Sequence, residues 1–98
     1  MVRPKKCRCI SREPGVTYFK PVGVPLKQLK EIELSIDEFE AIRLVDFLDQ
    51  EQISAAEKMK VSQPTLNRLL KSARKKSAEY LVNGYSLKIN GGNYYISR

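Results

Sequence analysis

Two amphipathic segments joined by a very short connection dominate the second half of this 98-residue sequence. Residues 50–60 place Ile53, Ala55, Ala56 and Met59 on one face at helical spacing, and the small alanines allow another helix to approach closely. In the next segment the apolar residues recur at positions i, i+3, i+4 and i+7, and they are Leu66, Leu69, Leu70 and Ala73. This spacing predicts two helices that pack on each other across a turn near Lys60.

The second of these segments has clear start and stop signals. Ser62 can cap the helix, Val61 and Leu66 can form a hydrophobic staple, and Pro64 is tolerated in the first turn. Asn83-Gly84 is a typical helix end. The sequence therefore predicts a helix of about 20 residues, roughly 30 Å long.

A further helix is predicted upstream of this pair. Ser35 and Glu38 have the spacing of a capping box, and Leu34 with Phe39 can form a staple around it. Apolar residues continue at helical spacing as far as Leu48. We expect this helix to end within residues 47–49.

The two ends of the chain are predicted to be non-helical. Four of the five prolines lie in the first 25 residues, where they exclude a long helix and leave short strands at 7–10 and 16–19. Residues 86–96 alternate around Asn90-Gly91, which is a strong hairpin signal. A hairpin is marginal alone, so it should pair with the N-terminal strands, pack on the helices or meet a second chain.

These elements predict a mainly α fold. We expect one helix-turn-helix domain over residues 1–98, with a core of three to four helices at 34–84. An irregular, basic, proline-rich arm at 1–33 would precede this core, and a small β-hairpin at 85–98 would follow it.

The charge is strongly positive and unevenly distributed. Lys and Arg number 18 against 11 Asp and Glu, which gives a net charge of +7. Residues 1–30 carry eight basic side chains and one acidic one, residues 31–57 nine acidic and one basic, and residues 58–98 nine basic and one acidic. This segregation favours a polyanionic partner that meets one face of the protein.

Composition also argues against an enzyme. The chain has no histidine, so it lacks the usual general base and every imidazole metal ligand. It has no phosphate-cradling glycine motif and no convincing pair of nucleophile and base. Cys7 and Cys9 supply only two of the four ligands that a structural zinc needs, so we expect no metal and no cofactor.

We expect a cytoplasmic protein without a membrane partner. No apolar stretch of signal-peptide length follows the basic N-terminus, and no apolar run approaches the roughly 20 residues that span a bilayer. Reduced thiols are expected at Cys7 and Cys9, because a disulfide between residues so close in sequence would be strained.

The outer face of the predicted second helix carries side chains suited to double-stranded DNA. Gln and Asn can bind adenine, Arg can bind guanine, and Lys contacts phosphate. The predicted contact residues are Ser62, Gln63, Pro64, Thr65, Asn67, Arg68, Lys71, Arg74 and Lys75. Glycine is usual at the turn position between the two helices, because it takes a positive φ at little cost. In this sequence the position is occupied by Lys60.

The basic arm offers a second set of contacts. Arg3, Lys5, Lys6 and Arg8 are of the type found in arms that enter the minor groove beside a recognition helix. Alternatively, the charges of the arm add only non-specific attraction.

Motifs along nearly the whole chain resemble the uncharacterised protein family 0251, also called domain of unknown function 134. They are Arg3-Pro4, Tyr18-Phe19-Lys20-Pro21-x-Gly23-x-Pro25, Asp37-Glu38-x-Glu40-Ala41-x-Arg43-Leu44-x-Asp46, Gln52-x-x-Ala55-Ala56-x-x-Met59-x-Val61-Ser62-x-x-Thr65-x-x-Arg68-x-Leu70-x-x-Ala73-Arg74-x-Lys76 and Gly91-Gly92. The resemblance implies a small prokaryotic protein predicted to bind DNA, with a helix-turn-helix similar to that of region four of sigma factors. It implies a transcriptional regulator without naming a pathway.

Three functions remain open at this point. The first is a DNA-binding transcriptional regulator that acts as a homodimer and inserts the helix beginning near Ser62 into the major groove. The second is an adaptor for RNA polymerase or another regulator, with the acidic block at 31–57 as its contact surface. The third is RNA binding, with Tyr85, Tyr94 and Tyr95 as stacking surfaces.

Overall fold

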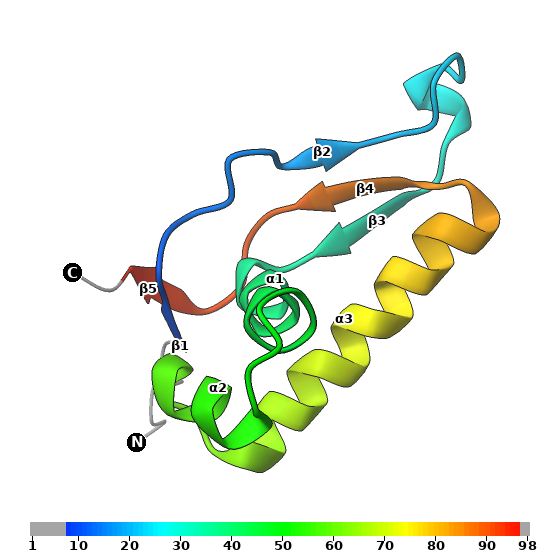
Figure 1. Ribbon diagram of the computed structural model, residues 1–98. Coiled ribbons are helices and arrows are strands. Elements are labelled where there is room, and N and C mark those ends of the chain that lie inside the picture. The colour runs from blue at the N-terminus through cyan, green and yellow to red at the C-terminus, as the bar shows by residue number, and fades with distance from the viewer. Residues whose placement is uncertain (1–7, 97–98) are drawn as a thin grey trace, which may run out of the picture.

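The computed structural model describes residues 8–96. In chain order these residues form β1 (Arg8–Ile10), β2 (Tyr18–Phe19), the 3-10 turn η1 (Leu26–Gln28), β3 (Glu31–Leu34), α1 (Ile36–Ile42), the π-helical turn η2 (Arg43–Phe47), α2 (Gln52–Met59), α3 (Gln63–Asn83), β4 (Ser86–Ile89) and β5 (Tyr94–Ile96). In Figure 1, strands β2, β4 and β3 lie above α3, and α2 lies beside the N-terminal end of α3.

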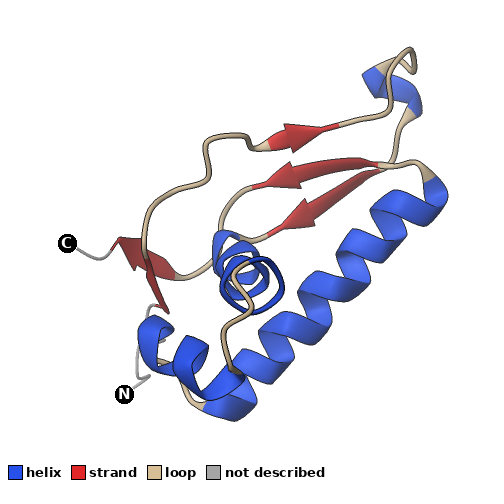
Figure 2. Cartoon of the chain, viewed as in Figure 1, coloured by secondary structure: helices blue, strands red, loops and turns tan. Residues whose placement is uncertain are grey.

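The expectation of a mainly α fold is wrong. Helix makes up 49% of the described residues and strand about 18%, and two small sheets accompany the three α-helices in this part of the chain. The fold is therefore mixed α/β (Figure 2). The segment expected to be an irregular arm contributes β1, β2 and β3, so its described part belongs to the sheets.

Strand β4 is the centre of the larger sheet. It pairs with β2 in the antiparallel sense and with β3 in the parallel sense. Strand β5 instead forms a separate parallel pair with β1, in which Tyr95 lies opposite Cys9. Because β4 and β5 do not pair with each other, the expected C-terminal hairpin is also wrong.

The connection after β4 explains this difference. The N–H of Asn90 donates to the carbonyl of Leu34, and the N–H of Ile36 donates to the carbonyl of Gly91. The Asn-Gly pair therefore crosses the N-terminal end of α1, and the chain continues into β5, which pairs with β1. The hairpin signal at Asn90-Gly91 is local, so it carried no information about which distant strand would be the partner.

The predicted helix starts are confirmed. Ser35 and Glu38 form a reciprocal capping box on α1, and Ser62 accepts a hydrogen bond from the N–H of Thr65 at the start of α3. Helix α3 is unbroken and ends at Gly84, which has a left-handed conformation with φ of 66°. The expected inner position of Ile53 on α2 is wrong, because its side chain is 56% exposed.

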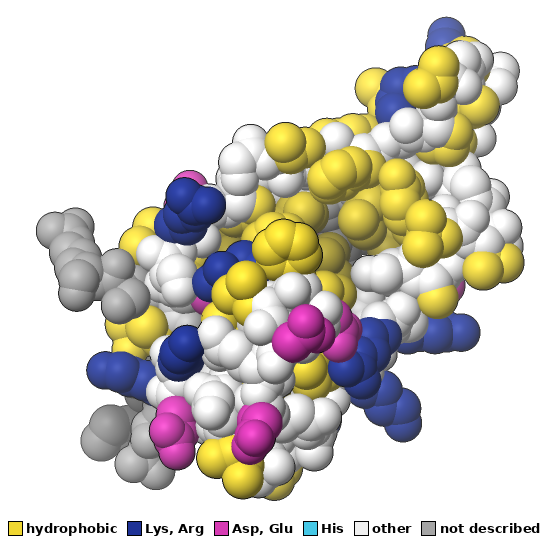
Figure 3. All heavy atoms as spheres, in the orientation of Figure 1, with side chains coloured by type: hydrophobic (Ala, Val, Ile, Leu, Met, Phe, Trp, Pro, Cys, Tyr) yellow, Lys and Arg dark blue, Asp and Glu magenta, His cyan; other side chains and the backbone are white. Residues whose placement is uncertain are grey.

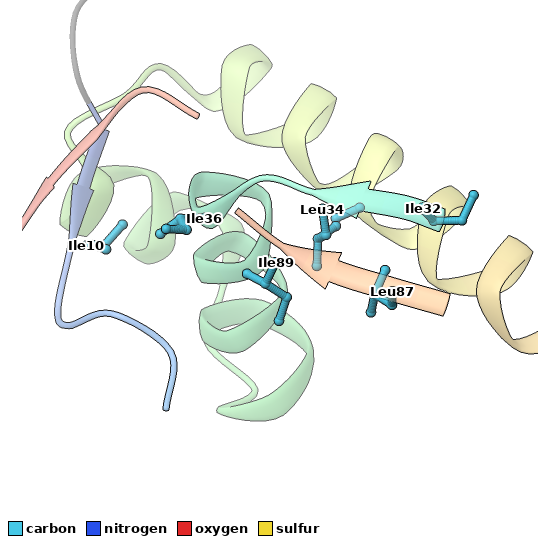
Figure 4. Close-up of a cluster of buried hydrophobic side chains, with 7 residues drawn as sticks. Ile10, Ile32, Leu34, Ile36, Leu87 and Ile89 are labelled. Atoms are coloured by element: carbon cyan, nitrogen blue, oxygen red, sulfur yellow. The ribbon is translucent and has the colours of Figure 1, made fainter. Parts of the chain in front are cut away.

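Two clusters of buried side chains share the long helix. The first joins the sheets to α1 and α3 and contains Ile10, Ile32, Leu34, Ile36, Ala73, Leu87 and Ile89 (Figure 4). The second joins α1 and η2 to α2 and α3 and contains Ala41, Leu44, Ala55, Ala56, Met59, Leu66 and Leu70. Despite the length of α3, none of the helices within residues 8–96 is both long and apolar enough to cross a membrane.

Substitution of Gly92 tests whether residues 90–92 cross the N-terminal end of α1. It has a φ of +97°, and a Cβ atom there would lie 2.6 Å from Oδ1 of Asp37 and 2.9 Å from Cβ of Ser35. We expect Gly92→Ala to lower the free energy of unfolding by about 1–3 kcal/mol, because both the backbone conformation and the contact become unfavourable. Thermal unfolding followed by circular dichroism measures this change.

Gly15→Ala is the matched control, since nothing lies within 4 Å of a Cβ at that position and its φ is not positive. Equal melting temperatures for the Gly92 variant and the wild type would show that the chain does not cross α1 as described.

Candidate nucleic-acid interface

The turn between α2 and α3 keeps a tight geometry although it lacks glycine. Lys60 has φ of 56° and ψ of 44°, which is the left-handed conformation, and its N–H donates to the carbonyls of Ala56 and Glu57. The next N–H, of Val61, also donates to the carbonyl of Ala56. Lysine thus adopts here the conformation that glycine takes more readily, at a cost of roughly 1 kcal/mol.

Helix α3 packs on α2 along one side only. Met59, Leu66 and Leu70 are fully buried between the two helices, next to the small side chains of Ala55 and Ala56. The residues on the other side of the first turns of α3 are exposed, and they are Gln63, Pro64, Asn67, Arg68 and Lys71. The sequence-predicted contact residues at the start of α3 are therefore brought together on one accessible surface.

Two hydroxyls of the predicted set have a structural role. Ser62 Oγ accepts from the N–H of Thr65 at 3.3 Å, and the two side-chain oxygens lie 2.9 Å apart in a hydrogen bond. Arg68 Nη2 donates to Oγ1 of Thr65 at 3.3 Å. Ser62 and Thr65 thus close the N-terminal turn and orient Arg68.

Arg74 is held by an acidic side chain of η2. Its Nε and Nη2 atoms donate to the two carboxylate oxygens of Asp46 at 3.0 and 2.7 Å. These hydrogen bonds hold the pKa of Asp46 below its usual value. Since both side chains are partly exposed, the pair contributes only about 0–1 kcal/mol, but it turns the Arg74 guanidinium towards η2.

Lys76, on the opposite side of α3 from Lys71, is held in the same way by α1. Its Nζ lies 2.8 Å from Oε1 of Glu38, and Ser72 donates a hydrogen bond to the other carboxylate oxygen. Burial alone would raise the pKa of Glu38, but the hydrogen bonds from Lys76, Ser72 and Ser35 outweigh it and lower the pKa below the usual value. Glu38 is therefore a charged, buried link between α1 and α3.

Of the four predicted arm residues, the structure describes only Arg8. Arg8 lies in β1 with its Nε 3.8 Å from Oδ2 of Asp37, and its side chain is only 21% exposed. The Nε atom is buried and has no hydrogen-bond partner. Arg3, Lys5 and Lys6 lie outside the described residues.

The basic side chains that stay available on α3 are Arg68, Lys71 and Lys75. Lys71 and Lys75 are exposed and have no hydrogen bond or ion pair with another described residue. Figure 3 shows Lys and Arg atoms gathered along the outer side of α3. The sequence could not distinguish these lysines from Arg74 and Lys76, because the acidic partners come from distant segments.

The described residues include no cluster of metal-ligating side chains. Among residues 8–96, no three His, Cys, Asp or Glu side chains are placed to hold a metal ion. Cys9 is a free, buried thiol, and Cys7 lies outside the described range.

The ion pair between Glu38 and Lys76 predicts that the free energy of unfolding decreases at acidic pH. Because folding lowers the pKa of Glu38, its charge stabilises the fold at pH values above the unfolded pKa, and this contribution disappears as the pH falls through the lower, folded value. We expect Glu38→Gln to lower the free energy of unfolding at pH 7 by about 1–3 kcal/mol and to flatten its decline at acidic pH. Urea unfolding at several pH values measures both effects.

Glu33→Gln is the control, because Glu33 is exposed on β3 and should leave the pH dependence unchanged. A Glu38→Gln variant whose stability falls with acid as steeply as that of the wild type would contradict the assigned role.

Comparison with known proteins places this chain in a family. The family model described as "Protein of unknown function DUF134" matches residues 1–97. A UPF0251 protein of Thermoanaerobacter pseudethanolicus is 53% identical over 96 residues, which cover 98% of this chain and 81% of that protein. A UPF0251 protein of Dehalococcoides mccartyi is 52% identical over 96 residues, which cover 98% of this chain and 82% of that protein.

No solved structure gives a significant match. The sequence matches extend over almost the entire chain, and the identities are high enough to establish common ancestry. The chain therefore belongs to the UPF0251 family of proteins of unknown function DUF134.

Proposed function

We propose that this protein binds double-stranded DNA through the N-terminal half of α3 and acts as a transcriptional regulator. The observation that carries the proposal is the exposed row of Gln63, Asn67, Arg68 and Lys71 on a helix whose opposite side is anchored on α2. A recognition helix of the helix-turn-helix type needs this division between a packed side and an open side.

The side chains divide into two kinds of contact. Gln63 and Asn67 have amide groups that can pair with adenine in the major groove, and Arg68 can pair with guanine. Lys71 and Lys75 lie further along the same side and are suited to phosphate. Arg74 is not assigned to DNA, because Asp46 already occupies its guanidinium.

Lys60 adds a cation at the edge of this surface. It is exposed in the turn directly before α3 and accepts a backbone conformation that glycine would adopt at lower cost. A stability requirement alone would favour glycine. A phosphate contact by the Lys60 ammonium gives a physical reason for lysine at this position.

The adaptor function has less support. It relied on the acidic block at 31–57 as an open contact surface, but Asp37, Glu38 and Glu40 are buried and Asp46 is paired with Arg74. The exposed acidic residues that remain are divided between β3 and the region of α2, and they are Glu31, Glu33, Asp49, Glu51 and Glu57. RNA binding through tyrosines also has less support, because only Tyr95 of the three predicted stacking residues is an exposed side chain. Tyr85 packs against the sheet cluster, and the Tyr94 hydroxyl donates to Glu13.

The first test is selection of duplexes from a randomised library at near-physiological salt, followed by sequencing. A DNA regulator should enrich a defined sequence. Retention that depends on salt without enrichment would reduce the proposal to non-specific electrostatic binding. Absence of retention at low salt would overturn it.

Single substitutions on α3 then separate the two kinds of contact. We expect Arg68→Ala to weaken binding to the selected duplex by about 1–3 kcal/mol and binding to a random duplex by less. We expect Lys71→Ala to weaken both duplexes equally and to reduce the salt slope by about 1. Titrations by fluorescence anisotropy at three salt concentrations measure both quantities.

Lys88→Ala on β4 is the matched control, since it removes a lysine from the sheet. Binding that responds as strongly to Lys88→Ala as to Lys71→Ala would mean that net charge, and not the surface of α3, carries the interaction.

A further inference from the structure

A surface hollow lies between α1 and the segment that follows β1. It has a volume of about 320 Å³, and its lining consists of Arg12, Glu13, Pro14, Gly15, Phe39 and Arg43. This volume falls within the range of pockets that bind small molecules. The lining combines two guanidinium groups with an aromatic ring, so it offers both charge and apolar surface to a ligand.

The guanidinium group of Arg43 is held in a fixed position in this lining. Its Nε donates to Oε1 of Glu40 at 2.7 Å, and its Nη2 donates to Oε2 of Glu40 and to Oγ of Ser11, both at 3.0 Å. Glu40 is only 2% exposed and does not belong to the lining. The third nitrogen of Arg43, Nη1, has no hydrogen-bond partner among residues 8–96, so it can donate to a ligand.

The segment that forms the other wall is anchored at two points. The N–H and the hydroxyl of Ser11 donate to Oε2 of Glu40 at 3.1 and 3.3 Å. The hydroxyl of Tyr94 in β5 donates to Oε1 of Glu13 at 3.2 Å. Pro14 further restricts the backbone between these anchors and Gly15. A hollow whose walls are ordered in advance loses little conformational entropy when a ligand binds.

The charges of the lining favour an anion. Arg12 is exposed and has no hydrogen bond or ion pair with another described residue. Arg12 and Arg43 carry two positive charges against the single negative charge of Glu13, which already accepts the hydrogen bond from Tyr94. The net charge of the whole chain is also positive, at +7. A concave surface with an excess of positive charge attracts anionic ligands.

We infer that this hollow binds a small organic anion. Its carboxylate or phosphate group pairs with Arg12 and with Nη1 of Arg43, because guanidinium donors match the oxygens of both groups. Its apolar part packs on Phe39 and Pro14. Phe39 is half-buried, since it packs against the sheet cluster on one side and lines the hollow on the other. An anion without an apolar part leaves this surface in water and binds more weakly.

The hollow is separate from the surface proposed for DNA. Glu38 of α1 binds Lys76 of α3, whereas Glu40 and Arg43 bind Ser11. A ligand therefore reaches Arg43 on the side of α1 that faces away from α3. The inference does not rest on the proposed function, and either can fail without the other.

The experiment is an NMR titration of the isotope-labelled full chain in a low-salt buffer without phosphate. The probes are phenyl phosphate, which has charge and a ring, inorganic phosphate, which has charge alone, and benzyl alcohol, which has a ring alone. We expect phenyl phosphate to shift the backbone amide signals of residues 11–13, 39 and 43 with a Kd of about 1 mM. Inorganic phosphate should shift them with a higher Kd, and benzyl alcohol should leave them unchanged.

Arg12→Gln tests the charge contact without disturbing the fold, because Arg12 is exposed and unpaired within the described part of the chain. We expect this variant to raise the Kd of phenyl phosphate about tenfold. Lys27→Gln removes the same charge from η1, outside the hollow, and is the matched control. It should leave the Kd unchanged.

Absence of these shifts at about 20 mM phenyl phosphate would overturn the inference, as would an Arg12→Gln variant with an unchanged Kd. Because DNA also carries phosphate, a random duplex is titrated separately. If the duplex shifts the signals of residues 11–13 and 43, the hollow binds the DNA backbone, which overturns a small ligand. Shifts confined to residues 63–71 support two separate sites. A duplex that shifts no signal contradicts the proposed function and leaves this inference standing.

Discussion

One-sided burial of α3 is the constraint on which the rest of the structure depends. Leu66 and Leu70 pack on α2 in one cluster, and Ala73 packs against the sheet side in the other. Each buried leucine contributes about 1.5–3 kcal/mol, and a small residue at 73 allows α1 and the sheet to approach the helix closely. Because the two clusters share this helix, α2 and the sheet keep a fixed relation to it.

Ion pairs from α1 and η2 determine which basic side chains of α3 stay available. Glu38 binds Lys76, and Asp46 binds Arg74, so two of the five basic residues at 68–76 are turned towards acidic partners. The segregation of charge along the sequence thus has a partly internal explanation. Glu38 and Asp46 neutralise two basic residues on one side of α3, and Lys71 and Lys75 stay exposed.

Local patterns predicted the helices well because a cap is a local interaction. The capping box of Ser35 and Glu38, the Ser62 cap and the Gly84 end each depend on residues within one turn of the helix end. The sheets depend on pairings between distant segments, such as Leu34 with Ile89 and Cys9 with Tyr95, and no local pattern encodes those partners. Strand β3, with only four residues, was therefore missed, and β4 and β5 were joined in a hairpin that does not exist.

The same distinction explains what could be predicted of the candidate site. Helical periodicity placed Gln63, Asn67 and Lys71 on the outer side of α3 correctly, since that follows from the spacing of Leu66 and Leu70 alone. It could not show that Arg74 is bound to Asp46 or that Arg8 is held beside Asp37. Whether a basic side chain is free to bind a partner depends on the tertiary structure, because the fold decides which acidic side chain lies near it.

The length of α3 gains a physical reason from this arrangement. Its first turns pack on α2 through Leu66 and Leu70, and its later turns pack on the sheet cluster through Ala73 and Tyr80, so the 21 residues of α3 reach both clusters. Its outer side changes along its length, from Lys71 and Lys75 to Ala78 and Val82, which lie on the same side at spacings of i+4, i+7 and i+11. Solvation alone would favour polar residues in the last two turns. Helix α3 is anchored along one side, and its other side changes from basic at Lys71 and Lys75 to apolar at Val82, so one rigid element displays two kinds of surface at a fixed separation.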